Sequence, residues 1–150
     1  SSMERTVTAA QMFLNARQLM EAYTTVLKPL CLETGMPQMA MDILLFLANN
    51  PDHATANEIC RLRGFKPGIV SVHVDKLVSE GLLQRESVPG DRRKTSLTPT
   101  NAASDLIARG RAMQKSFTHQ LMEGLSEDEL QCFMHCLTVF HRNIDRIRNA

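Results

Sequence analysis

The chain has 150 residues, of which 43% are hydrophobic and 22% charged, and its formal net charge at pH 7 is +1. This length and composition predict one soluble globular domain with a hydrophobic core. Because the net charge is close to zero, it argues neither for nor against nucleic-acid binding, so the distribution of charge along the chain has to decide.

Neither a membrane span nor a leader is expected. No apolar run approaches the roughly 20 residues that a span needs, and Asp42–Ala48 is typical of a buried helix. No basic stretch followed by an apolar run stands at the start, so we expect a cytoplasmic protein without membrane contact. Residues 1–3 are read as an expression scar and left out of the fold prediction. The single tyrosine and absent tryptophan exclude an aromatic platform for stacking single-stranded bases.

Two helices are predicted in the first third of the chain. The first carries apolar residues three and four positions apart, in one stripe: Phe13, Ala16, Met20, Tyr23, Leu27 and Leu30. Pro29 should end or kink this helix near Lys28, because proline lacks the backbone donor. Pro37 opens a second helix, and the Asn-Asn-Pro at 49–51 stops it.

The middle of the chain predicts two short helices and a β-hairpin. Thr55–Glu58 has threonine first and glutamate three positions on, which is a capping box, and Gly64 ends the helix that it opens. Pro67 opens the next helix. Its inner face is Val70, Val74 and Leu77, and its outer face is Ser71, Val72, Lys76 and Ser79. Two β-prone runs follow, Leu82–Ser87 and Lys94–Thr98.

Two further helices are predicted after the hairpin. Thr98-Pro99 has the pattern of an N-cap followed by proline at the first helical position, and Gly124 breaks the long helix that follows. Ser126–Glu129 is a second capping box. The last helix carries a strict heptad stripe of Leu130, Phe133, Leu137, Phe140, Ile144 and Ile147.

The narrow apolar stripes at the two ends of the chain need partners, because a helix inside one globule usually shows a broader apolar face. We predict that the two ends pack together and against a second copy in a symmetric homodimer. The alternative is an intramolecular pair of helices.

Several residues between Asn57 and Thr100 are typical of one known family. They are a leucine, glycine, leucine junction with a following arginine, a GDRR segment and a leucine-threonine pair: Leu77, Gly81, Leu82, Arg85, Gly90–Arg93 and Leu97-Thr98. On these residues the chain resembles the MarR family of bacterial transcription regulators, and the flanking helices are similar to that family's in length and order. Two departures are the missing glycine after Thr98 and Val72 after Ser71, where the family often has arginine, so no base preference carries over.

The resemblance implies a mainly α fold, a winged helix-turn-helix with a small two-stranded β-wing. Residues 1–35 and 100–150 would form the helical dimerisation region and residues 36–99 the DNA-binding region, within a single compact domain per protomer. No cofactor is expected.

Two surfaces are expected to contact double-stranded DNA. A helix fits the major groove, and the candidates on or near the outer face of the second short helix are Lys66, Gly68, Ser71, Val72, His73 and Lys76. His73 could equally be a half-buried packing residue. At the wing, the resemblance implies that Arg93 enters the minor groove and that Asp91 braces it, with Arg92 and Lys94 along the phosphates.

Sensing sites are predicted with several alternatives. The resemblance implies a small aromatic or phenolic effector, for which the candidate residues are Arg17, Met20, Tyr23, Met39 and Ile43. Some relatives sense oxidants through a thiol, and Cys31, expected in a polar-rimmed loop, is the redox candidate. Cys60 is expected to be an inert core residue. Cys132, His135 and Cys136 could seat a soft metal, but small thiols also pack well beside a heptad seam, and we predict no metal site.

The function predicted is a sequence-specific DNA-binding transcription regulator, a homodimeric repressor on an inverted-repeat operator that an effector or oxidant releases or modulates. The alternative is an effector-binding or partner-binding helical dimer without DNA recognition. An enzyme is not expected. Gly90–Thr95 has the lysine-threonine of a phosphate-binding loop, but Arg93 stands where the loop requires glycine, and a strand follows instead of a helix.

Overall fold

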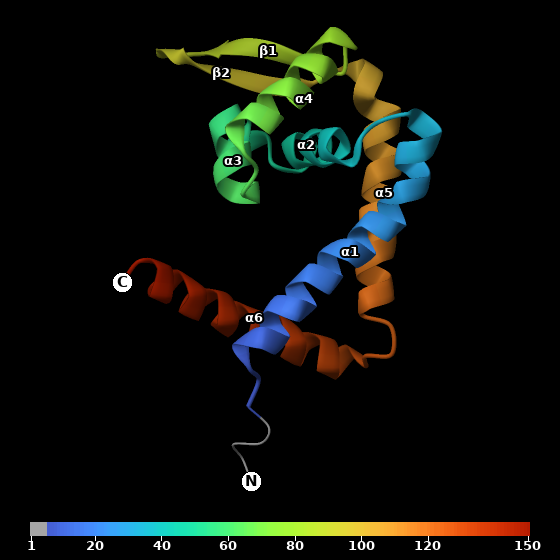
Figure 1. Ribbon diagram of the computed structural model, residues 1–150, viewed down its shortest axis with the longest axis vertical. Coiled ribbons are helices and arrows are strands. Elements are labelled where there is room, and N and C mark those ends of the chain that lie inside the picture. Colours follow the sequence, from blue (N-terminus) through green and yellow to red (C-terminus); the bar gives the residue numbers. More distant parts are fainter. Residues whose placement is uncertain (1–5) are drawn as a thin grey trace. The chain divides into compact units, whose positions relative to one another are not determined.

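The computed structural model describes residues 6–150, so the segment read as an expression scar lies outside the described residues. The chain is mainly helical with one two-stranded antiparallel sheet, as predicted (Figure 1). Its elements are α1 (Ala9–Thr34), α2 (Gln38–Asn49), the 3-10 turn η2 (Pro51–His53), α3 (Ala56–Arg63), α4 (Pro67–Ser79), β1 (Leu83–Val88), β2 (Asp91–Pro99), η3 (Asn101–Ala103), α5 (Ser104–Leu121) and α6 (Glu127–Arg148).

The chain divides into two compact units. The first ends at Lys115, and the second comprises Ser116–Ala150. Helix α5 continues across the boundary, and the second unit contains its last residues and all of α6.

Helix α1 continues through Pro29 to Thr34, so of the two outcomes predicted at this proline, an end or a kink near Lys28, the end is wrong. The packing of the neighbouring residues explains this, since Leu27 and Leu30 on either side of the proline are 0% and 4% exposed. The turn after the proline has additional hydrogen bonds, because the Thr34 hydroxyl donates to the Leu30 carbonyl at 2.7 Å. Burial of two leucines and this hydrogen bond offset the single backbone bond that proline removes.

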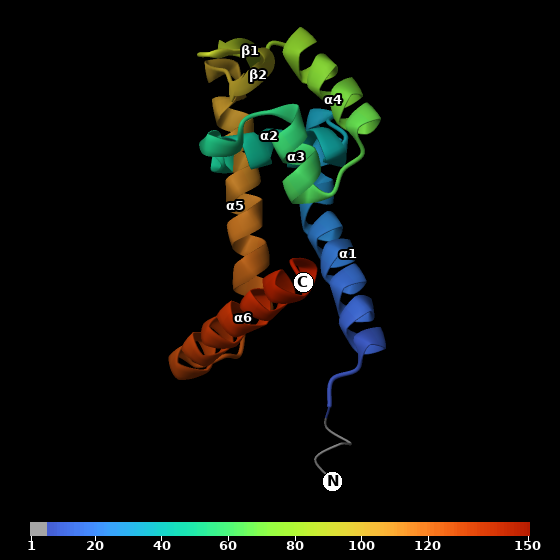
Figure 2. The same ribbon diagram turned by 90° about the vertical axis from the view of Figure 1, so that its left-hand side faces the viewer.

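The core of the first unit is built on α2, which has α3, α4 and the hairpin around it (Figures 1 and 2). Six of its twelve residues are buried: Ala40, Met41, Ile43, Leu44, Leu45 and Leu47. Buried residues of the other elements complete this core, among them Ile59 of α3 and Leu77 of α4. Because α2 is apolar on most of its circumference, it is an interior helix, as the sequence predicted.

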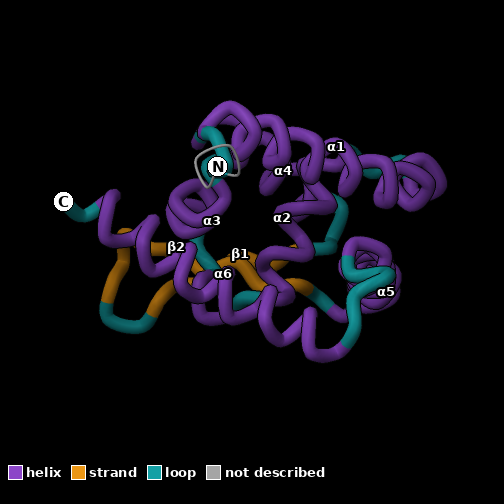
Figure 3. The backbone as a smooth tube through the Cα atoms, turned by 90° about the horizontal axis from the view of Figure 1, so that it is seen from below, coloured by secondary structure: helices purple, strands orange, loops and turns teal. Residues whose placement is uncertain are grey.

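Helix α4 and the hairpin follow the sequence prediction closely. Pro67 is the first residue of α4, and the predicted inner face, Val70, Val74 and Leu77, is buried. The hairpin is fixed to the body at its base, where Leu83 and Leu97 are buried and the Leu97 N–H donates to the Ala54 carbonyl at 2.6 Å. The two strands lie side by side and are joined by one loop (Figure 3).

The predicted helix start at Thr98-Pro99 is wrong. Pro99 is the last residue of β2 and pairs with Leu83, and α5 begins only at Ser104, after η3. The chain stays extended here because Thr100 is held to the turn between α4 and β1. Its hydroxyl donates to the Gly81 carbonyl at 2.5 Å and its N–H to the Leu82 carbonyl at 3.0 Å. These long-range bonds decide against a local N-cap that the sequence alone favoured.

Helix α6 begins with the predicted capping box, because Ser126 and Glu129 each accept from the other's backbone N–H. Across Glu127–Arg148 no residue is buried. The predicted heptad stripe is therefore largely open in one protomer, with Phe133, Leu137 and Phe140 between 37% and 41% exposed.

Among residues 6–150, no single helix is both long and apolar enough to cross a membrane. Only α1 and α2 taken together reach that length and composition, across a bend of 102°.

Candidate nucleic-acid interface

The tip of the hairpin carries three consecutive cations that have no partner on the opposite strand. Val88 pairs with Asp91 and Ser87 pairs with Thr95, so the register shift leaves Arg92, Arg93 and Lys94 unpaired. All three side chains are exposed, and none of them takes part in an ion pair with another described residue. The tip extends beyond α3 and α4 (Figure 1). A bulge of this kind therefore presents positive charge to the outside of the molecule.

Local chemistry sets the conformation of this tip. Gly90 comes directly after Pro89 and has a φ of +82°. A proline followed by a residue with positive φ is the pattern of a type II turn. The Asp91 carboxylate then accepts from the backbone N–H of Arg93 at 2.9 Å. Asp91 thus fixes the backbone of Arg93 and leaves its guanidinium free to contact another molecule, which differs in detail from the side-chain brace that the family resemblance implies.

An ion pair connects the hairpin to α4. The Arg85 guanidinium, on β1, contacts the Asp75 carboxylate, on α4. Arg85 was noticed in the sequence only as a family hallmark, and Asp75 was not singled out. Ten residues separate the two, so no local pattern predicts the contact. The pair connects α4 to the hairpin, the two elements that are expected to contact DNA.

The outer face of α4 is open, as predicted. Lys66, Gly68, Ser71, Val72 and Lys76 are all exposed, and Val72 is 66% exposed. His73 is half-buried, and its Nδ1 is enclosed without a hydrogen-bond partner among the described residues. This placement suits packing better than contact with a base, although its role in binding stays untested.

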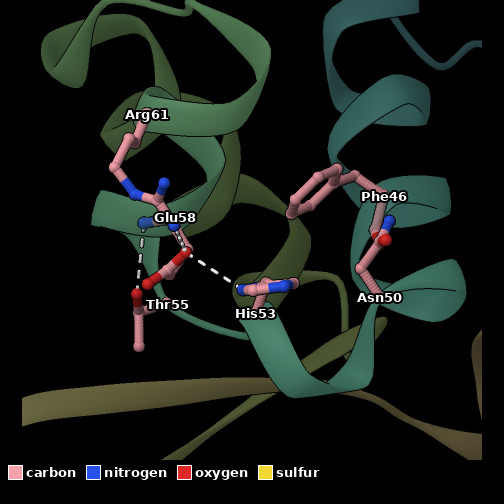
Figure 4. A network of polar contacts seen from close by, with 6 residues as sticks. All are labelled: Phe46, Asn50, His53, Thr55, Glu58 and Arg61. Atoms are coloured by element: carbon pink, nitrogen blue, oxygen red, sulfur yellow. Dashed lines mark hydrogen bonds and ion pairs between the residues drawn. The ribbon is translucent and has the colours of Figure 1, made fainter. Parts of the chain in front are cut away.

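The start of α3 is fixed by a small polar network (Figure 4). The Thr55 hydroxyl accepts from the Glu58 N–H at 3.2 Å, which is the expected cap. The Glu58 carboxylate turns instead to His53 at 3.1 Å and to Arg61 at 2.6 Å, and these contacts lower its pKa, Arg61 having the larger effect. The network fixes the first turn of α3, the helix that precedes α4.

Comparison with known proteins agrees with this geometry. A model described as MarR family matches residues 34–94, from the end of α1 to the hairpin tip. The crystal structure of transcriptional regulator PA3341 is 26% identical, with a TM-score of 0.78 over 94% of this chain and 98% of that chain. The chain is thus similar to the MarR family, in sequence over residues 34–94 and in fold over most of its length.

Other relatives are similar to the chain at lower identity. A putative family member from Listeria monocytogenes, solved with a 26mer DNA, is 15% identical, with a TM-score of 0.73 over 93% of this chain and 89% of that chain. The uncharacterised HTH-type transcriptional regulator YdgJ of Bacillus subtilis is 22% identical over 114 residues, which are 76% of this chain and 69% of that protein. The predictions of a MarR-type transcription regulator and of no enzymatic activity agree with these similarities.

The five effector candidates lie in different environments. Arg17 and Met20 are exposed on α1, and Arg17 lies 3.8 Å from Glu21. Tyr23 is half-buried, and its hydroxyl accepts from Gln114 of α5 at 3.0 Å. Met39 packs against the core, and Ile43 is 0% exposed within it. The effector site stays a prediction. Because Ile43 is fully buried, it could support such a site only by packing beneath the residues that contact the effector.

Cys31 is not in a loop, which corrects the sequence prediction, because α1 continues to Thr34. Burial, together with the charge of Asp42, raises the pKa of its thiol. The reactive thiolate form is thus disfavoured at neutral pH. Cys60 is half-buried against the core, as expected.

Asp42 is a polar residue that sequence reasoning missed. One of its carboxylate oxygens is buried without a hydrogen-bond partner, and burial raises its pKa to about 6, although Arg63 and Gln38 oppose the shift. Tyr23 nearby also has a raised pKa, first through burial and further through the charge of Asp42. The available signal was a lone acidic residue inside the apolar stretch Met41–Ala48.

Proposed function

We propose that this regulator binds double-stranded DNA as a homodimer and represses transcription from an inverted-repeat operator. The observation that carries the proposal is the bulged hairpin tip, where Arg92, Arg93 and Lys94 are exposed and unpaired. Cations presented in this way match the phosphate backbone and the negative potential of a narrow minor groove.

The proposed docking uses both reading elements of one protomer. The exposed face of α4, with Ser71, Val72 and Lys76, enters the major groove, while Arg93 reaches the adjacent minor groove. The contact between Arg85 and Asp75 connects α4 to the hairpin and would favour one angle between these two elements. The complex of the Listeria monocytogenes relative with a 26mer DNA supports DNA as the ligand.

Homodimerisation is supported by the open apolar stripe of α6, since Phe133, Leu137 and Phe140 need a partner surface. A two-fold dimer reads two half-sites about 10 base pairs apart, which is why the operator is proposed to be an inverted repeat. A small aromatic or phenolic effector near Tyr23 and Met39 would change the spacing of the two α4 helices and release the DNA. Regulation of this kind places the protein in the cytoplasm.

The experiment selects bound fragments from random duplex DNA and then measures affinity for the selected sequence by fluorescence anisotropy. Arg93→Ala should weaken binding by about 10-fold to 100-fold, because one minor-groove arginine is lost. Arg142→Ala, which removes an exposed arginine from α6, is the matched control and should leave the affinity unchanged. Equal affinities of Arg93→Ala and the unaltered protein would contradict the assigned role, and enrichment of no sequence would favour the dimer without DNA recognition.

A further inference from the structure

Helix α6 carries two free cysteines on its surface, Cys132 and Cys136, and both are exposed. A spacing of four residues places them one above the other on the same side of the helix. Cys31 and Cys60 differ from them, because both are half-buried. Exposed thiols are uncommon on proteins, since cysteine is normally among the most buried residue types.

Packing within the apolar stripe of α6 does not account for this pair. At about 100° of rotation per residue, Cys132 lies roughly 110° around the helix from the middle of the stripe formed by Phe133, Leu137 and Phe140, and Cys136 lies roughly 70° from it. Cys132 therefore lies outside the stripe and Cys136 lies at its edge, and both thiols are exposed in the single chain.

The two thiols interact with each other. The pKa of Cys136 is raised, mainly by its hydrogen bond with Cys132 and further by the negative charge that Cys132 carries when ionised. Two adjacent thiolates are therefore unfavourable by themselves. A ligand that bonds to both sulfurs removes this repulsion, because it takes the place of both protons.

The surroundings limit which ligand fits. Among residues 6–150, no three His, Cys, Asp or Glu side chains converge on a point where they could hold a metal ion. Zinc, which takes four ligands in structural sites, therefore lacks partners here. Soft centres that are satisfied by two thiolates fit better, since thiolates select Cu(I) and other thiophilic atoms.

We propose that Cys132 and Cys136 together bind one thiophilic atom through both of their sulfurs. Two kinds of ligand supply such an atom, trivalent organoarsenicals and Cu(I). With phenylarsine oxide, the two S–H groups form two As–S bonds and the arsenic oxygen leaves as water, so no atom changes its oxidation state. With Cu(I), two Cu–S bonds form and two protons are released. The site is independent of the DNA-binding function proposed above.

The test titrates phenylarsine oxide into the full-length protein and follows free thiols and intact mass. We expect one arsenical per chain and protection of two thiols. Cys132→Ser and Cys136→Ser should each weaken capture by about 100-fold or more, because the second bond forms within one molecule. Cys31→Ser and Cys60→Ser are matched controls and should capture the arsenical as the unaltered protein does. Circular dichroism checks that all variants fold.

A second arm supplies Cu(I) from a competing chelator and compares it with zinc. Capture of either the arsenical or Cu(I) by this pair supports the site. The proposal would be overturned if the protein captured neither the arsenical nor Cu(I). It would also be overturned if capture persisted when Cys132 and Cys136 were both replaced by serine. Zinc bound as tightly as Cu(I) would contradict coordination by two thiolates alone.

Discussion

Asp42 illustrates how one side chain can respond to pH inside an apolar helix. Its pKa rises from 3.8 to about 6 because the carboxylate is buried, and neither Arg63 nor Gln38 compensates fully. Since the folded protein binds this proton more tightly than the unfolded chain, the resulting stability is fully present below about pH 4. It is lost as the pH rises through 6.

We predict that Asp42→Asn removes this loss. Because Asp42 is partly exposed, the expected gain is about 1–2 kcal/mol in the free energy of unfolding at pH 7.5 and close to zero at pH 4. Urea denaturation of both proteins between pH 4 and pH 8 measures the difference. A gain that is equal at every pH would show that the carboxylate of Asp42 does not titrate in this way.

Glu58 provides a control of opposite sign. Its pKa is lowered, chiefly by the hydrogen bond from Arg61, so its contribution is present above the unfolded value and is lost as the pH falls. Glu58→Gln should therefore be less stable than the unaltered protein at pH 7.5 and equal to it at acid pH.

At the scale of elements, α5 passes close to α2 because Gly110 has no side chain. A β-carbon at this position would lie 2.6 Å from Cδ2 and 2.9 Å from Cδ1 of Leu45, which is itself fully buried. The Leu45 side chain belongs to the buried core, so any shift that makes room for a β-carbon would press it against its core neighbours. Gly110 therefore sets the distance between the two helices.

Gly110→Ala should lower the free energy of unfolding by about 1–3 kcal/mol through overpacking. Gly68→Ala is the matched control, because no atom lies within 4 Å of a β-carbon there, and its stability should be unchanged or slightly higher. Midpoints of urea denaturation measure both effects. Equal stability of Gly110→Ala and the unaltered protein would mean that the core around Leu45 can rearrange at little cost.

The two errors in element boundaries have a common cause. Pro29 and Pro99 were both interpreted from local proline rules, yet α1 continues through the first and β2 includes the second. In each case contacts with residues far away in the sequence, or burial of the neighbouring leucines, outweigh the local preference. Thr100, held to Gly81 and Leu82, shows this most directly.

At the scale of the whole molecule, the open surface of α6 points to assembly. Phe133, Leu137 and Phe140 are each more than a third exposed, and no residue of α6 is buried in one protomer. A heptad stripe of this kind is stable in water only when another apolar surface covers it.

Leu137→Glu should convert the proposed homodimer to monomers at micromolar concentration, because a charge would be buried in the apolar seam. Gln131→Glu places the same residue on another side of α6 and should leave the mass in solution unchanged. Analytical ultracentrifugation measures both. A dimer that survives Leu137→Glu would place the interface elsewhere.

Local chemistry was enough to predict much of this protein from its sequence. Capping residues, turn residues and apolar periodicity act within a few positions, so Thr55, Gly64, Pro67 and the inner face of α4 were predicted correctly. The family resemblance, confirmed by comparison, and the cationic hairpin tip were also readable from consecutive residues.

Only the tertiary structure decided the features that depend on residues far apart. It revealed the contact between Asp75 and Arg85, the unpaired carboxylate oxygen of Asp42 and the approach of Gly110 to Leu45. The physical reason is that desolvation, steric exclusion and long-range hydrogen bonds arise from the environment that the folded chain creates, which no short window of sequence contains.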